Sequence, residues 1–149
     1  MDKNLSDGLP LPQRYGAIAT IIIGISMAVL DGAIANVALP TIASDLHASP
    51  ASSIWIVNAY QIAIVVSLLS FSFLGDMFGY RRVYQCGLVV FTFTSLFCAL
   101  SDSLHTLTLA RIAQGFGGAA LMSVNTALIR LIYPQRHLGR GMEIGRAHV

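Results

Sequence analysis

Four long apolar runs dominate the sequence and constrain its fold more than any other feature. Each run is near or above the ~20 residues with which a helix crosses hydrocarbon, whereas strands of a membrane barrel would be about ten residues long with alternating polarity. Only 11% of the residues are charged, against about 25% in a typical soluble domain. We therefore predict an all-α membrane protein with helices at about 16–39, 54–74, 83–100 and 107–132.

The basic residues between the runs predict the direction of the chain. Lys and Arg occur before the first run, between the second and third, and around the end of the fourth, at Lys3, Arg14, Arg81, Arg82, Arg130, Arg136 and Arg140. The other two connections, at about 41–53 and 101–106, contain neither residue type. Because cytoplasmic connections are enriched in Lys and Arg, we expect residues 1–15 to form a cytoplasmic tail.

The first run has an alternative interpretation as a signal peptide. Its apolar part before Asp31 is short, and Ala33-Ile34-Ala35 resembles the small residues of a cleavage site. Apolar character continues to Leu39 and three further runs follow. A retained membrane helix is therefore the favoured interpretation.

Two charged residues, Asp31 and Arg111, lie inside apolar runs. Counted along their helices, they lie about 12 Å and about 7 Å inside the outer membrane surface, so we expect them to compensate each other directly or through water. The functional interpretation is a proton site, in which Arg111 stays charged and tunes Asp31. The structural alternative is a static ion pair between two helices, and the poor stabilisation by buried pairs argues slightly against it.

Small residues recur at every fourth position in two of the runs. The first run contains Gly16, Thr20, Gly24, Ala28, Gly32 and Asn36, and the fourth contains Gly115, Ala119 and Ser123 with Gly117 and Gly118 beside them. Small residues let membrane helices approach closely. We predict helix packing at Gly24, Gly32, Gly115 and Gly118.

Three segments resemble the major facilitator superfamily, specifically its fourteen-helix drug–proton antiporter branch. Residues 30–40 (LDGAIANVALP) are similar to that branch's signature on the first helix. Residues 74–82 (LGDMFGYRR) resemble the connection between the second and third helices, and residues 111–119 (RIAQGFGGA) resemble the proton-coupling motif on the fourth. The chain departs from the usual residues of these motifs at Ala33, Ser72 and Met77.

The resemblance implies roles for particular residues. Arg111 and Gln114 would belong to proton coupling, and Asp31 and Asn36 to the substrate or proton path. The connection between the second and third helices would be a cytoplasmic gating loop that latches against the second half of the transporter, formed by Gly75, Asp76, Gly79, Arg81 and Arg82.

The resemblance also implies that the chain is an N-terminal fragment. Residues 16–142 would hold the first four helices of the N-terminal bundle, and residues 143–149 resemble a translated sequencing adapter, so we expect an artefactual tail there. The full-length parent is expected to be a multi-pass protein of the bacterial inner membrane. It would export lipophilic, cationic compounds against protons, with the proton gradient as its energy source and no cofactor, whereas the fragment alone would transport nothing.

Other functions fit the sequence less well. A transporter of another small solute, or a four-helix membrane scaffold or accessory subunit, are the alternatives. An enzyme is disfavoured because the sequence has no metal-ligand cluster, no phosphate-binding glycine loop and no plausible nucleophile–base pair. Nucleic-acid binding is disfavoured because there is no basic face with interleaved aromatic residues. The expected partner is the lipid bilayer.

Overall fold

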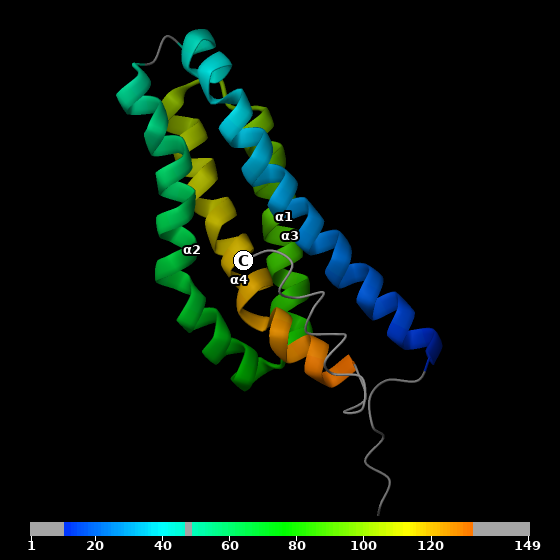
Figure 1. Cartoon of the computed structure of the whole chain (residues 1–149). Coiled ribbons are helices and arrows are strands. Elements are labelled where there is room, and N and C mark those ends of the chain that lie inside the picture. The colour runs from blue at the N-terminus through cyan, green and yellow to red at the C-terminus, as the bar shows by residue number, and fades with distance from the viewer. Residues whose placement is uncertain (1–10, 47–48, 133–149) are drawn as a thin grey trace, which may run out of the picture.

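The protein is a bundle of four antiparallel helices. The computed structural model describes residues 11–46 and 49–132. The helices are α1 (Leu11–Asp45), α2 (Pro50–Phe78), α3 (Tyr80–Ala99) and α4 (Leu104–Ile132), and α1 crosses the other three diagonally (Figure 1). The predicted all-α fold class is confirmed, because the described residues contain no strand.

The exterior of the bundle is apolar. Within the described ranges all four helices are long and apolar enough to cross a membrane. Large apolar side chains point outward along them, and Val37 of α1 and Leu69 of α2 are each 82% exposed. Lipid is the environment in which such a surface is stable, because exposure of so much apolar area to water is unfavourable.

The helices extend beyond most of the predicted ends. Ser49 caps α2, because its side chain accepts a hydrogen bond of 3.1 Å from the backbone N–H of Ser52. α1 continues through Pro40 to Asp45; proline is tolerated in membrane helices when nearby groups take over the freed backbone bonds. The apolar runs mark only the parts of the helices that lie in hydrocarbon, so polar end turns escape such a prediction.

The connection between α2 and α3 is a single residue, Gly79. Its φ of 94° is left-handed backbone that suits glycine. The sequence-based description of this region as a loop is wrong. Gly75 and Asp76 belong to the last turns of α2, whereas Arg81 and Arg82 belong to the first turn of α3. The charged residues and glycines suggested a loop. They lie instead in helical backbone, at the end of α2 and the start of α3.

α4 lies at the centre of the bundle and packs most extensively on α2 and α3. Glycines make this possible. A Cβ on Gly117 would lie 2.7 Å from the backbone nitrogen of Phe91, and one on Gly115 would lie 2.7 Å from the carbonyl oxygen of Tyr60. These helices therefore touch backbone to backbone, as small-residue interfaces in membranes do. α1 packs less extensively on the other helices than they do on one another. Its polar contacts therefore matter more for its attachment to the bundle.

Candidate polar site

Asp31, Arg111 and Gln114 form a closed ring of hydrogen bonds. Arg111 Nη1 donates to Asp31 Oδ2 at 2.6 Å and to Gln114 Oε1 at 2.6 Å. Gln114 Nε2 closes the ring by donating to Asp31 Oδ1 at 2.8 Å. The expected compensation of the two charges is thus a direct ion pair. It joins the middle of α1 to the N-terminal half of α4.

The two charged partners differ in exposure. The Arg111 side chain is 5% exposed, whereas that of Asp31 is 21% exposed. Gln114 is fully buried at 0%. The guanidinium is therefore enclosed by the bundle, whereas the carboxylate lies partly at its surface.

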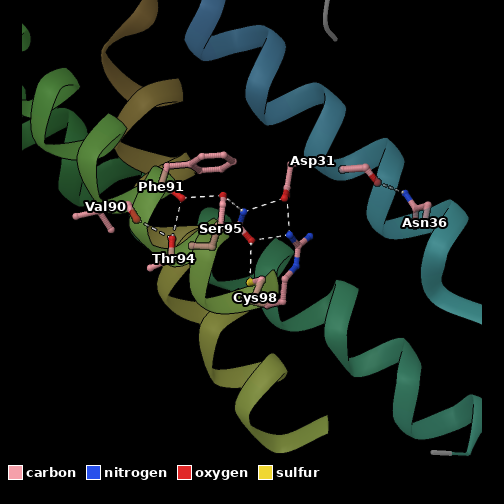
Figure 2. Close-up of polar contacts among 10 residues, drawn as sticks. Asp31, Asn36, Val90, Phe91, Thr94, Ser95 and Cys98 are labelled. Carbon is pink, nitrogen blue, oxygen red and sulfur yellow. Dashed lines mark hydrogen bonds and ion pairs between the residues drawn. The ribbon is translucent and has the colours of Figure 1, made fainter. Parts of the chain in front are cut away.

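Gln114 connects this ring to α3. Its Nε2 also donates to Ser95 Oγ at 2.7 Å, and its Oε1 also accepts from Cys98 Sγ at 3.5 Å. Ser95 can accept because its own hydroxyl hydrogen goes to the carbonyl oxygen of Phe91 at 2.8 Å. Figure 2 shows these bonds converging between α1 and α3. Three helices are therefore joined through one amide.

Tyr60 brings the fourth helix to the same place. The guanidinium carbon of Arg111 lies 4.3 Å from the centre of the Tyr60 ring, which is the geometry of a cation–π contact. The Nε of Arg111 is buried and has no hydrogen-bond partner in the described structure. The Tyr60 ring therefore contacts the guanidinium on a side where no hydrogen bond is made. With this contact, residues from all four helices gather around Arg111.

Asn36 does not contact this site, and its place on the substrate or proton path stays a prediction. Its Nδ2 donates to the carbonyl oxygen of Gly32 at 3.0 Å, within its own helix. Figure 2 shows this bond apart from the network around Asp31. Five residues correspond to about 140° beyond a full helical turn, so the two side chains point to different sides of α1.

The predicted gating residues lie together at the other end of the bundle. Asp76 accepts a hydrogen bond from the Tyr80 hydroxyl. A Cβ on Gly75 would lie 2.9 Å from Val124 of α4, so this glycine lets α2 approach α4. Arg81 and Arg82 are exposed, and Gly79 makes the turn.

The predicted packing glycines behave differently from one another. Gly24 faces the hydroxyl of Tyr84, which would clash with an added Cβ. Gly115 and Gly118 face Tyr60, the first at its backbone and the second at its hydroxyl. No described atom lies within 4 Å of a Cβ added to Gly32, so packing at Gly32 stays a prediction. α1 crosses the bundle at an angle, and its stripe of small residues leaves the described interface beyond Asp31.

Sequence patterns did not identify Ser95, Cys98 or Tyr60 as part of the site. Each is an uncharged residue within an apolar run, so no local pattern distinguishes it. Their positions along the helices would have predicted the contacts with Gln114 only if the register of α3 against α4 had been known. Within the described ranges, no three His, Cys, Asp or Glu side chains gather closely enough to hold a metal ion.

Comparison with known proteins places these features in a family. The sequence model of the Major Facilitator Superfamily matches residues 21–147. The chain is 85% identical to the uncharacterized transporter YebQ of Escherichia coli (strain K12) over 144 residues, which are 97% of this chain and 32% of YebQ. The chain therefore spans about a third of that relative's length.

Two more distant relatives carry names that describe what they transport. The riboflavin transporter RibZ of Clostridioides difficile (strain 630) is 34% identical over 139 residues, which are 93% of this chain and 30% of RibZ. The tetracenomycin C resistance and export protein of Streptomyces glaucescens is 35% identical over 137 residues, which are 92% of this chain and 25% of that protein. With its four apolar helices and a family match over most of its length, this multi-pass membrane chain belongs to the major facilitator superfamily of transporters.

Proposed function

We propose that the four helices form part of the first bundle of a proton-coupled exporter, in which Asp31 takes up and releases the proton. The observation that carries this proposal is the pairing of a partly exposed carboxylate with a buried guanidinium, 2.6 Å apart, where four helices meet. Arg111 cannot deprotonate in a protein, so the protonation of its partner is the variable of the pair.

A static ion pair is the competing explanation of the same geometry. Buried pairs are poor stabilisers, because the cost of removing two charges from water offsets their attraction. An apolar pair would hold α1 to α4 at least as well in lipid. The partial exposure of Asp31 adds nothing to a structural role and is required for proton exchange. These considerations favour transport.

The proposed substrates are lipophilic, cationic small molecules. Support comes from the drug-antiporter motif at residues 30–40 and from the name of the Streptomyces relative, which describes the export of tetracenomycin C. A second candidate is a transporter of another small solute, and the name of the riboflavin transporter relative supports it. A scaffold or accessory role is the third, and the polar site speaks against it because such a protein needs no buried charges.

The proposal includes the membrane in which the protein lies and its orientation there. The N-terminus and the turn at Gly79 face the cytoplasm of a bacterial inner membrane, as the distribution of Lys and Arg indicates. The segment from Gly75 to Arg82 then lies on the cytoplasmic side, where it latches against the second half of the transporter. The proton gradient supplies the energy, without a cofactor.

The decisive experiment uses a full-length chimera, in which this chain replaces the aligned 144 residues of the E. coli relative. Efflux of a cationic dye and of riboflavin is measured in vesicles with and without an imposed pH gradient. We expect dye efflux that requires the gradient and is abolished by Asp31→Asn. Gradient-driven riboflavin transport instead would support the second candidate. Export unaffected by Asp31→Asn would disprove the proton role, and absence of any transport would favour the scaffold.

A further inference from the structure

Asp76 lies where α2 disfavours a negative charge. It belongs to the last turn of α2, and the carbonyl end of a helix carries a partial negative charge. Arg81 and Arg82 follow closely in the sequence, yet the described structure has no ion pair between Asp76 and either of them. Among the described residues, its one side-chain hydrogen bond comes from the Tyr80 hydroxyl. A tyrosine of the next helix thus compensates an acid that the stability of α2 alone does not favour.

The Tyr80 ring is held as closely as its hydroxyl. A Cβ on Gly75 would lie 2.8 Å from Cδ1 of Tyr80, so the ring occupies the space that a side chain at position 75 would need. The same Cβ would lie 2.9 Å from Cγ1 of Val124, which brings α4 to this point. The ring also packs against the buried apolar core. Tyr80 therefore lies beside the contact of α2 with α4, where its ring has little room to turn the hydroxyl elsewhere.

The single-residue turn brings the two bonded residues together. The backbone N–H of Gly79 donates to the carbonyl oxygen of Gly75 at 3.0 Å, and its φ of 94° then redirects the chain into α3. Tyr80 is the first residue of α3, so its bond to Asp76 joins the end of one helix to the start of the next. This junction lies at the end of the bundle where α4 also ends (Figure 1).

We propose that Tyr80 is a positioning residue, whose hydroxyl holds the Asp76 carboxylate in the orientation in which it binds the second half of the transporter. Tyr80 donates to Oδ1, and Oδ2 accepts from an N–H or O–H donor of the second half. This rests on the proposed function only in taking the segment from Gly75 to Arg82 as a latch. It adds the residue that orients the acid of that latch and the chemical class of the partner.

A purely structural bond is the competing explanation of the same contact. Such a bond stabilises the turn between α2 and α3, and its loss lowers the unfolding midpoint. A positioning bond acts on the rate of transport instead, because a latch forms and breaks in every transport cycle. It leaves substrate affinity unchanged, since Asp76 lies at the opposite end of the bundle from the polar site around Asp31.

The test uses the full-length chimera with Tyr80→Phe, which keeps the ring over Gly75 and removes only the hydroxyl. Initial rates are measured against the concentration of dye or riboflavin, whichever the chimera transports. We expect a maximal rate about three- to tenfold lower, as one hydrogen bond would give, with KM and the unfolding midpoint unchanged. Tyr15→Phe, whose ring is exposed, is the matched control and should transport normally. A maximal rate equal to that control would overturn the proposal.

A double-mutant cycle shows whether the hydroxyl acts through Asp76. Asp76→Ala removes the carboxylate, and we expect it to lower the maximal rate at least as much as Tyr80→Phe does. Tyr80→Phe should then lower the rate no further in the Asp76→Ala background, because residues that act through one contact are not additive. Additive losses would mean that the hydroxyl acts independently of Asp76 and would reject this role.

Rescue at position 80 completes the test. The amino acid 4-aminophenylalanine carries an N–H donor in place of the hydroxyl, so its incorporation should restore most of the lost rate. A rate as low as that of Tyr80→Phe, or a lower unfolding midpoint that accompanies the loss, would assign the bond a structural role only. The proton role of Asp31 is tested separately by Asp31→Asn in the same chimera. Transport that ignores Asp31→Asn but responds to Tyr80→Phe would reject the proton role and support this inference.

Discussion

Arg111 and Asp31 lie 80 residues apart in the sequence, and their side chains meet at 2.6 Å. Tyr60 and Gln114 contact the Arg111 guanidinium from two further directions. The cation is therefore held by three groups, and Asp31 is the one that joins it to α1.

Arg111→Lys is expected to impair export despite keeping the positive charge. A lysine ammonium lacks the planar group that binds Asp31 and Gln114 from one nitrogen while stacking on Tyr60. Loss of one charge-assisted hydrogen bond corresponds to about 1.5–3 kcal/mol, so we expect at least a tenfold lower rate of gradient-driven dye efflux in the chimera. Thr108→Ser, which keeps its hydroxyl bond to Leu104, is the control and should export normally. Equal rates for both variants would contradict the prediction.

Gly117→Ala is expected to destabilise the contact between α3 and α4. The added methyl would lie 2.7 Å from the backbone nitrogen of Phe91 and 3.1 Å from the carbonyl oxygen of Gly87. Backbone atoms cannot rotate away, so the helices must separate at a cost of about 1–3 kcal/mol. Gly32→Ala is the matched control, because nothing described lies within 4 Å of its added methyl. In SDS unfolding from mixed micelles, Gly117→Ala should unfold at a lower SDS fraction than Gly32→Ala. Equal unfolding midpoints would refute the packing argument.

Gly79→Ala is expected to strain the turn between α2 and α3. The glycine has a φ of 94°, and an L side chain in such backbone costs about 1–3 kcal/mol. Because no other residue separates the two helices, the strain must shorten one of them. Circular dichroism on thermal unfolding should show a lower midpoint than for Gly16→Ala, a glycine with open space around it. A midpoint matching that control would show that the turn relaxes freely.

The sequence was enough to predict the pair of Asp31 and Arg111, but not the residues that surround it. Asp31 and Arg111 were identifiable because charges in apolar runs are costly and need a reason. Ser95 and Tyr60 carry no such cost, so their place in the network depends on helix register. That register is set by backbone contacts at glycines such as Gly115, whose partners lie on another helix. Sequence spacing finds the small residues but not which of them face a neighbour.

The same limitation applies to Gly32. Gly24 and Gly32 lie on one stripe of α1, and a straight helix parallel to its neighbours would bury both. α1 instead crosses the bundle (Figure 1), so the stripe enters the interface at Gly24 and has left it by Gly32. A crossing angle results from packing across the whole interface, and a period of four residues does not encode it.

Tyr84→Phe is expected to loosen the inner half of α1. The Tyr84 hydroxyl of α3 donates to the backbone of α1, to the carbonyl oxygen of Thr20 at 3.0 Å and to that of Ile21 at 3.5 Å. Its loss should cost about 0.5–1.5 kcal/mol. Hydrogen–deuterium exchange in nanodiscs should become faster by roughly two- to tenfold in α1 around Thr20, because a free-energy change of that size shifts a local opening equilibrium by such a factor.

The control is Tyr15→Phe, whose ring is 68% exposed and should leave exchange unchanged. Unchanged exchange around Thr20 in Tyr84→Phe would mean that the buried contact of Ile21, and not this hydroxyl, holds the inner part of α1.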